Sequence, residues 1–360
     1  MLSSSTSSHF LLASLPIGRR MAIICGVLMI MLFLAGLISL ACGAAPIPWD
    51  DVGRLILRGI GFQIGLDLPN AQATIVNQVR LPRILVGAVV GAALACSGGT
   101  MQGIFRNPLA DPSIIGVSVG GSLGAVIAIS TGLVVRQAWL ITLFSFAGAM
   151  GAATLVYLLS LVRGQSQPAT LLLAGVAVNS FFGAMISALL LLTNRFPEVQ
   201  AILGWLIGGL RGRGWSHLGV VILPVFLSIG LLFFFARDIN LLLLGEETAQ
   251  GLGVNVPRTR FILLALVSLA TGSVVSITGP IGFVGLVVPH MLRLVIGPDY
   301  RLLLPASALG GAVFLVIADT IARLALQPAE LQAGIVTALV GAPFFTFLLY
   351  RNRRLLYSIQ

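Results

Sequence analysis

The sequence predicts an all-α, polytopic membrane protein with about ten transmembrane helices and cytoplasmic N- and C-termini. Its 360 residues are 58% hydrophobic and only 9% charged, and the mean hydropathy is +1.05. A soluble domain needs more charge than this to cover its surface, so lipid must be the main solvent. A helix needs roughly 20 apolar residues to cross the hydrocarbon, and the chain is long enough for about ten such helices with short connections.

The apolar runs, in chain order, span residues 21–43, 84–104, 113–133, 138–162, 169–193, 215–236, 259–277, 281–296, 303–324 and 332–350. An even number of crossings places both termini on one side. Arg19 and Arg20 precede the first run, and Arg351, Arg353 and Arg354 follow the last, which marks that side as cytoplasmic. We therefore predict a polar cytoplasmic tail at 1–20, one transmembrane domain at 21–354 and a short tail at 355–360.

Composition excludes several classes of function. All 21 basic residues are arginine, so the chain lacks the lysine that a P-loop ATPase or a retinal Schiff base requires. The net charge of +10 is scattered between apolar runs, which favours anionic lipid over nucleic acid as its partner. Three histidines and three cysteines without ligand spacing predict no metal site. We expect no cofactor in this chain.

The largest cytoplasmic connection, 237–258, contains the segment LGEETAQGLGV. Glu246 and Glu247 suit the positive end of a short helix, and Gly251 or Gly253 can end it. This segment is either a surface turn or a coupling helix, near 245–254, that docks on a separate ATPase.

Several long motifs resemble the FecCD family, the permease subunits of ABC importers for iron siderophores, haem and vitamin B12. They are LGEETAQGLGV, VRLPRILVGAVVGAALACSGGTMQGIFRNPLADPSIIGVSVGG at 79–121, GPIGFVGLVVPHMLRLVIGPDYRLLLPASALGGA at 279–312 and ADTIARLALQPAELQAGIVTALVGAPFF at 318–345. They occur in the family's order from about residue 74 onward. The resemblance implies a non-enzymatic conduit in the bacterial inner membrane. It also implies its partners: a second copy of the chain, two subunits that bind ATP and Mg, and a periplasmic binding protein.

The resemblance also assigns roles to individual residues. The ATPase-coupling positions are Gly245, Glu246, Glu247, Ala249, Leu252 and Gly253. The positions expected to dock glutamates of the binding protein are Arg80, Arg83 and Arg323, although arginines at helix ends also snorkel to the interface. The cytoplasmic gate is expected at Asn107, Pro108, Leu109, Pro168 and Ala169. Gln167-Pro168-Ala169-Thr170 departs from the small hydroxyl residues of the vitamin B12 member.

The cargo follows from weaker signals. MQGIFRNPLADP is most similar to the haem-importing branch, and Arg211 and Arg213 on the outside either meet anionic propionates or anchor the chain at the interface. We predict haem, with ferric siderophores or cobalamin as alternatives. A proton- or sodium-coupled secondary transporter is the competing class, but it needs ionisable groups at mid-membrane depth. Asp319 alone lies well inside a span, four residues from Arg323. For His290, in the eighth span, we expect a structural role.

Overall fold

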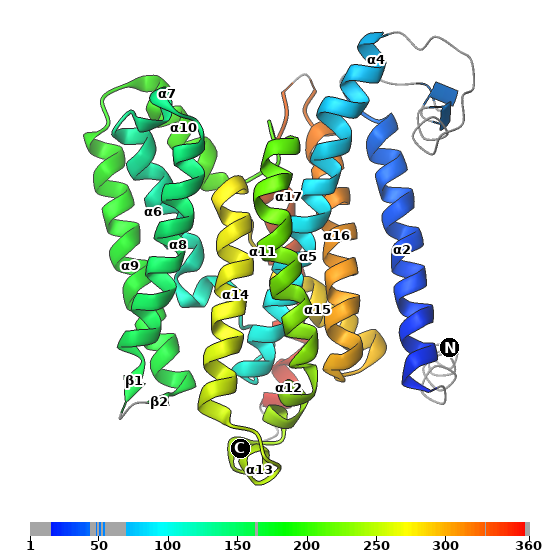
Figure 1. Cartoon of the computed structure of the whole chain (residues 1–360), viewed down its shortest axis with the longest axis vertical. Coiled ribbons are helices and arrows are strands. Elements are labelled where there is room, and N and C mark those ends of the chain that lie inside the picture. The colour runs from blue at the N-terminus through cyan, green and yellow to red at the C-terminus, as the bar shows by residue number, and fades with distance from the viewer. Residues whose placement is uncertain are drawn as a thin grey trace.

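The protein is an upright bundle of helices (Figure 1), which confirms the predicted fold class. The computed structural model describes residues 16–43, 48, 50–51, 53–54, 70–162, 165–327 and 329–356. Most of both predicted tails, and most of the outside loop that the sequence predicts at 44–74, lie outside the described residues. The described sheet is one antiparallel hairpin of β1 (Leu161–Val162) and β2 (Gln165–Ser166).

Each of the ten predicted runs coincides with a helix. They are α2 (Ile17–Ala41), α5 (Leu81–Ile104), α6 (Val117–Ser130), α8 (Trp139–Leu159), α9 (Pro168–Leu192), α11 (Trp215–Phe234), α14 (Val256–Thr278), α15 (Val284–Ile296), α16 (Tyr300–Leu324) and α17 (Ala333–Leu356). Among the described residues, seven helices, counting α5 with the turns before it as one, are long and apolar enough to span a membrane, and α6, α15 and α17 are shorter apolar helices.

Short elements connect these helices at the two ends of the bundle. They are α4 (Asn70–Thr74), the π-helix η1 (Ile75–Arg80), the 3₁₀-helix η2 (Pro112–Ile115), α7 (Leu133–Arg136), α10 (Phe196–Ile207), α12 (Ala236–Leu243) and α13 (Glu246–Gly251). The start of α2 and the end of α17 lie at the same end as α13, whereas α4, α7 and α10 lie at the opposite end (Figure 1). We call the α13 end cytoplasmic and the α10 end outer, following the predicted topology.

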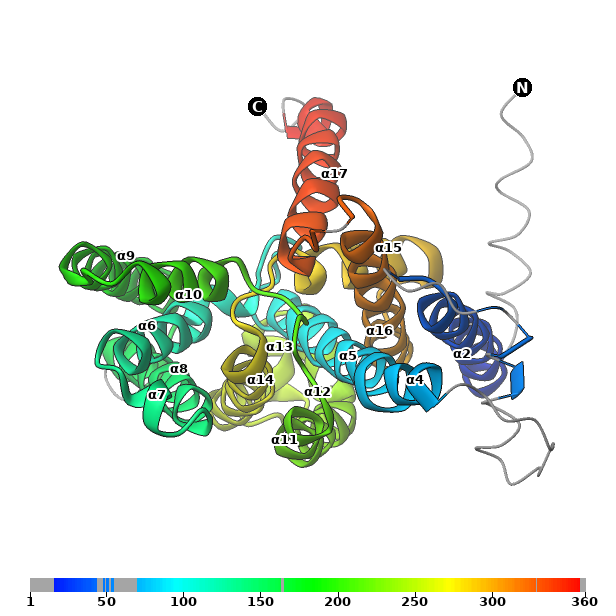
Figure 2. The same ribbon diagram turned by 90° about the horizontal axis from the view of Figure 1, so that it is seen from above.

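Glycines bring the central helices into close contact. α5 is surrounded by α11, α14, α15 and α16 (Figure 2). A Cβ atom on Gly91 of α5 would overlap the backbone carbonyl of Gly311 in α16, and one on Gly120 of α6 would overlap that of Gly148 in α8. Membrane helices associate by packing because lipid supplies no hydrophobic drive between them. Glycine at these crossings lets the two backbones approach closely.

Helix α2 lies at the edge of the bundle and exposes most of its apolar surface. Arginine side chains connect its two ends to the rest of the bundle. Arg20 Nη2 donates to the Ile296 carbonyl at 2.9 Å, and at the outer end Arg80 and Arg323 donate to the last carbonyls of the helix. Cations at a helix C-terminus also complement its dipole. Hydrogen bonds at its two ends therefore hold α2 to the bundle, and most of its apolar surface is left for lipid.

We predict that Gly91→Ala destabilises the protein and that Gly230→Ala does not. The new methyl group at position 91 meets the backbone of α16, whereas nothing lies within 4 Å of the corresponding position at Gly230. Overpacking of this kind costs about 1–3 kcal/mol. Thermal unfolding of the two variants in detergent measures the difference, and equal melting temperatures would contradict the tight crossing.

Candidate functional site

Helix α13 projects from the cytoplasmic end of the bundle (Figure 1). Gly245 precedes it with φ +116°, a conformation that favours glycine. Glu246 and Glu247 occupy its first turn, where they complement the helix dipole. Gly253, with φ +89°, turns the chain after the helix ends. The short helix opened by two acids is thus present where the sequence predicts it.

The surface of α13 mixes charge with exposed apolar side chains. Glu247 is exposed, and Leu244 and Leu252 are 63% and 57% exposed. Ala249, however, is completely buried, because its methyl group packs into the chain's own core, and its coupling role stays a prediction. Leu244, an exposed apolar residue beside the predicted acids, was not among the predicted coupling positions.

Glu246 joins α13 to two other parts of the chain. Its Oε1 accepts from Arg260 Nη2 of α14 at 2.6 Å and lies 3.7 Å from Arg106 Nη2. Arg106 follows α5 and adopts φ +48°, a left-handed conformation that is uncommon for a residue with a side chain. The carboxylate therefore connects the projecting helix to the loop that begins the predicted gate.

The predicted gate residues lie at the surface of this chain. Asn107, Pro108 and Leu109 are all exposed, as is Ala169, and Pro168 is half-buried. The Oδ1 atom of Asn107 accepts from the Leu109 amide at 2.9 Å, which fixes the turn.

The 3₁₀-helix η2, which follows this turn, packs against α9. The Asn179 side-chain amide of α9 donates to the Ser113 carbonyl at 3.1 Å. Because Gly175 of α9 has no side chain, the backbone of Ile114 packs directly against it. Pro168 begins α9. Both predicted gate segments are therefore attached to the same helix.

The three predicted docking arginines are buried at the outer end. Arg80, Arg83 and Arg323 are 5%, 7% and 6% exposed. Arg83 makes two hydrogen bonds to Asp319, from Nε at 2.9 Å and from Nη2 at 3.0 Å, and a third to Glu330 at 3.0 Å. The end of α2 and two carboxylates cover these arginines in this structure.

Asp319 has two arginine partners. The predicted pairing with Arg323 is present, with Nε at 3.4 Å from Oδ2, but Arg83 is the closer partner. Arg323 also donates to the Ser39 and Cys42 carbonyls of the α2 end. This cluster, which we call the outer arginine cluster (Arg80, Arg83, Arg323, Asp319 and Glu330), joins α2, α5 and α16. A docking role for its arginines stays a prediction.

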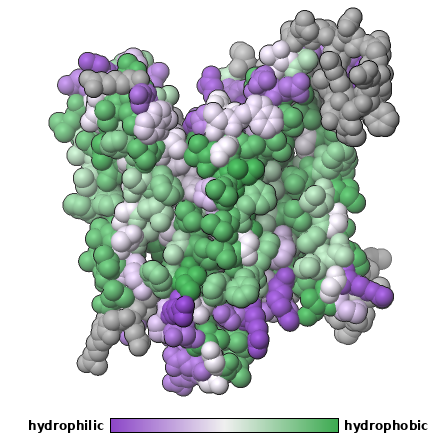
Figure 3. Space-filling view, viewed as in Figure 1, coloured by the Kyte–Doolittle hydropathy of each residue, from purple (hydrophilic) through white to green (hydrophobic). Residues whose placement is uncertain are grey.

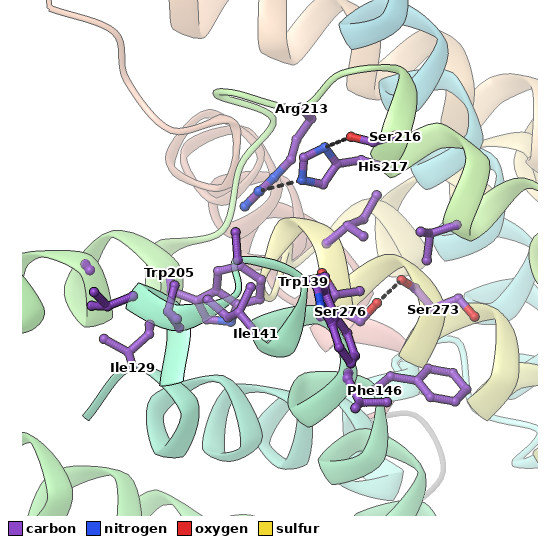
Figure 4. A pocket seen from close by; sticks show the side chains of 18 of the residues that line it. Ile129, Trp139, Ile141, Phe146, Trp205, Arg213, Ser216, His217, Ser273 and Ser276 are labelled. Carbon is purple, nitrogen blue, oxygen red and sulfur yellow. Dashed lines mark hydrogen bonds between the residues drawn. The ribbon is translucent and has the colours of Figure 1, made fainter. Parts of the chain in front are cut away.

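Arg211 and Arg213, predicted on the substrate side, have different surroundings. Arg211 is exposed, whereas Arg213 is half-buried, with its guanidinium 5.4 Å from the centre of the Trp205 ring. Burial lowers the pKa of Arg213 to about 10, so the guanidinium still carries its charge at neutral pH. Arg213 lines a cavity bounded by α8, α10, α11 and α14 (Figure 4). α11 lies on the opposite side of the molecule from α17 (Figure 2).

His290 packs against two aromatic rings of α17. The centres of the Phe344 and Phe345 rings lie 6.3 Å and 6.2 Å from that of the imidazole. The described residues contain no group of three or more His, Cys, Asp or Glu side chains that could hold a metal ion.

These features agree with the comparison to known proteins, since residues 12–351 match the model of the FecCD transport family. The chain belongs to the FecCD transport family. The cobalamin import system permease protein BtuC of Halobacterium salinarum is 47% identical over 303 residues, covering 84% of this chain and 79% of that protein. The hemin transport system permease protein HmuU of Yersinia pestis is 43% identical over 287 residues, covering 76% and 83%.

A solved chain, described as a metal-chelate type ABC transporter in an inward-facing conformation, has the same fold. Its TM-score is 0.78 and its identity 33%, and the match covers 91% of this chain and 99% of that one. The protein is therefore the multi-pass permease of an ABC importer for iron chelates, haem or cobalamin, with partner ATPase and binding-protein subunits, and is not itself the catalytic subunit. This removes the secondary-transporter alternative. A cobalamin permease and a hemin permease are both similar to this chain, so the comparisons show the class of cargo and not one cargo.

We predict that Arg83→Ala destabilises the FecCD-family permease far more than Arg195→Ala. Removing one partner of a buried ion pair costs about 3–5 kcal/mol, and here Asp319 would lose its closer partner and keep only Arg323, whose Nε lies 3.4 Å from Oδ2. Arg195 is also an outer arginine paired with a carboxylate, but its side chain is 78% exposed, so its loss should cost at most about 1 kcal/mol. Thermal unfolding measures both. If Arg83→Ala folds with normal stability and loses only stimulation by the binding protein, the cluster is a docking site rather than a structural joint.

Proposed function

We propose that two copies of this chain form the translocation pathway of a metal-chelate importer, with haem as the cargo. The observation that supports this proposal is that the predicted gate residues Asn107, Pro108, Leu109 and Ala169 are exposed in one chain. A gate exposed in one chain needs a second surface to close against. A two-fold dimer provides the same residues again across its axis.

A cysteine cross-linking experiment tests this arrangement. In a variant without native cysteines, Asn107→Cys or Leu109→Cys should cross-link to the same position of the second copy in at least one nucleotide state. Leu231→Cys, on the exposed surface of α11, is the matched control and should not cross-link. A lack of cross-links at both gate positions in every nucleotide state would refute the symmetric gate.

The second part of the proposal concerns energy coupling. α13 projects at the cytoplasmic end and exposes Leu244, Glu247 and Leu252, a mixture that suits docking on a protein surface. ATP and Mg bind to the partner subunit. Because Glu246 contacts Arg260 and Arg106, displacement of α13 by the ATPase would pull directly on the loop that carries Asn107 to Leu109.

Glu246→Gln and Glu247→Gln separate docking from transmission. A charge-assisted hydrogen bond contributes about 1.5–3 kcal/mol, so Glu246→Gln should reduce transport about tenfold or more while ATP hydrolysis by the assembled complex persists. Glu247→Gln should instead weaken binding of the ATPase and leave transport per assembled complex intact. Transport and hydrolysis measured on the same proteoliposomes distinguish the two. Unchanged coupling in Glu246→Gln would disprove transmission through this carboxylate.

Docking of the binding protein at Arg80, Arg83 and Arg323 remains part of the proposal. It requires the α2 carbonyls to release Arg80 and Arg323, so that glutamates of the binding protein replace them. Arg83 would keep Asp319. The binding protein should therefore increase amide hydrogen exchange at residues 39–43, which end α2.

Cargo is tested by uptake into vesicles that contain the full complex. We expect haem to be transported in preference to cobalamin and ferric citrate. Cobalamin is the second candidate because the relative with 47% identity imports it. Faster uptake of cobalamin than of haem would replace the haem assignment while leaving the importer architecture intact.

A further inference from the structure

A cavity of about 1060 Å³ lies between α8, α10, α11 and α14 near the outer end of the bundle (Figure 4). It is at the upper limit of the roughly 300–1,000 Å³ typical of ligand sites. Several apolar residues that line it are exposed at the surface of the chain, among them Trp139, Leu143 and Val220. The surrounding face of α8, α14 and α11 is a hydrophobic band with hydrophilic residues at its two ends (Figure 3). The cavity therefore opens toward the membrane.

Two hydrogen-bond donors at this cavity have no partner among the described residues. They are Nε of Arg213 and Nε1 of Trp205, and both atoms are buried. Buried donors normally find an acceptor, and leaving one unpaired costs about 1–3 kcal/mol. An acceptor from outside the chain would satisfy both side chains.

The charge at the cavity favours an anion. Arg213 has no carboxylate within salt-bridge distance among the described residues, and its Nη1 lies 3.3 Å from Nε2 of His217. Glu198, the acid that lines the cavity, is paired with Arg195 at 3.3 Å. Ser216 adds a hydroxyl group at the same rim. The polar groups gather at the outer end of an otherwise apolar wall.

We infer that this cavity binds an anionic phospholipid, with the phosphate against Arg213, Trp205 and Ser216 and an acyl chain along the apolar wall of α8 and α11. A guanidinium is well suited to phosphate because it offers several donors in one plane. An apolar wall beneath a single cation, opening at membrane depth, matches a lipid rather than a water-soluble anion. The site lies near the outer end of the bundle, whereas the proposed gate residues 107–109 follow Arg106, which contacts α13 at the cytoplasmic end, so the site is separate from the gate and does not depend on the cargo.

Quenching of tryptophan fluorescence by brominated lipids tests this inference directly. Trp139 and Trp205 line the cavity, and replacing Trp49 and Trp215 by phenylalanine leaves them as the only reporters in the full-length chain. In nanodiscs, brominated phosphatidylglycerol should quench at about fivefold lower mole fraction than brominated phosphatidylcholine, since one basic residue near an anionic headgroup contributes about 1 kcal/mol. Equal quenching by the two lipids would overturn the inference.

Matched variants identify the residue responsible. Arg213→Gln should abolish the preference, whereas Arg54→Gln, which removes an outer arginine that does not line the cavity, should retain it. If both variants lose it equally, general surface charge explains the preference and the site fails. Glu198→Gln should strengthen the preference about twofold or more by removing a nearby negative charge, so the inference stays testable if Arg213→Gln does not fold. Relief of quenching by millimolar glycerol phosphate would show a water-soluble anion site and would equally overturn it.

Discussion

Arg83 and Asp319 form a two-point ion pair in the contact between α5 and α16, and the outer half of the molecule is organised around it. The pair fixes how far α5 can slide along α16, and the close approach at Gly91 and Gly311 leaves no room to separate the two helices. With α5 and α16 fixed, Arg80 and Arg323 are in position to donate hydrogen bonds to the last carbonyls of α2. The charges are costly to bury but more costly to leave unpaired.

The cytoplasmic end uses the same chemistry for a different purpose. There Glu246 joins α13 to Arg260 and, at the longer distance of 3.7 Å, to Arg106. Its carboxylate is partly exposed, unlike that of Asp319, so water can replace one partner when the contact breaks. A buried ion pair at the outer end and a partly exposed one at the cytoplasmic end suit a permease whose movement begins at its cytoplasmic surface.

Sequence reasoning located the ten apolar helices and the short helix opened by Glu246 and Glu247, because hydrophobic runs and capping chemistry are local signals. It did not find the Arg83–Asp319 pair, whose partners are 236 residues apart. Spacing suggested Arg323 as the partner of Asp319, since i,i+4 neighbours can be read along a helix. For the same reason, the sequence placed Arg213 on the outside but could not show which side of the bundle it faces.

The burial of these arginines also bears on the topology. The predicted orientation left nine of the 21 arginines on the outer side, more than a simple preference for cytoplasmic charge would allow. The structure gives several of them internal partners: Arg54 with Asp51, Arg83 with Asp319 and Arg195 with Glu198. These pairs offset part of the outer charge. Arg213 differs from them, because its half-buried guanidinium has no carboxylate partner in the described part of the chain, and an external anion accounts for it best.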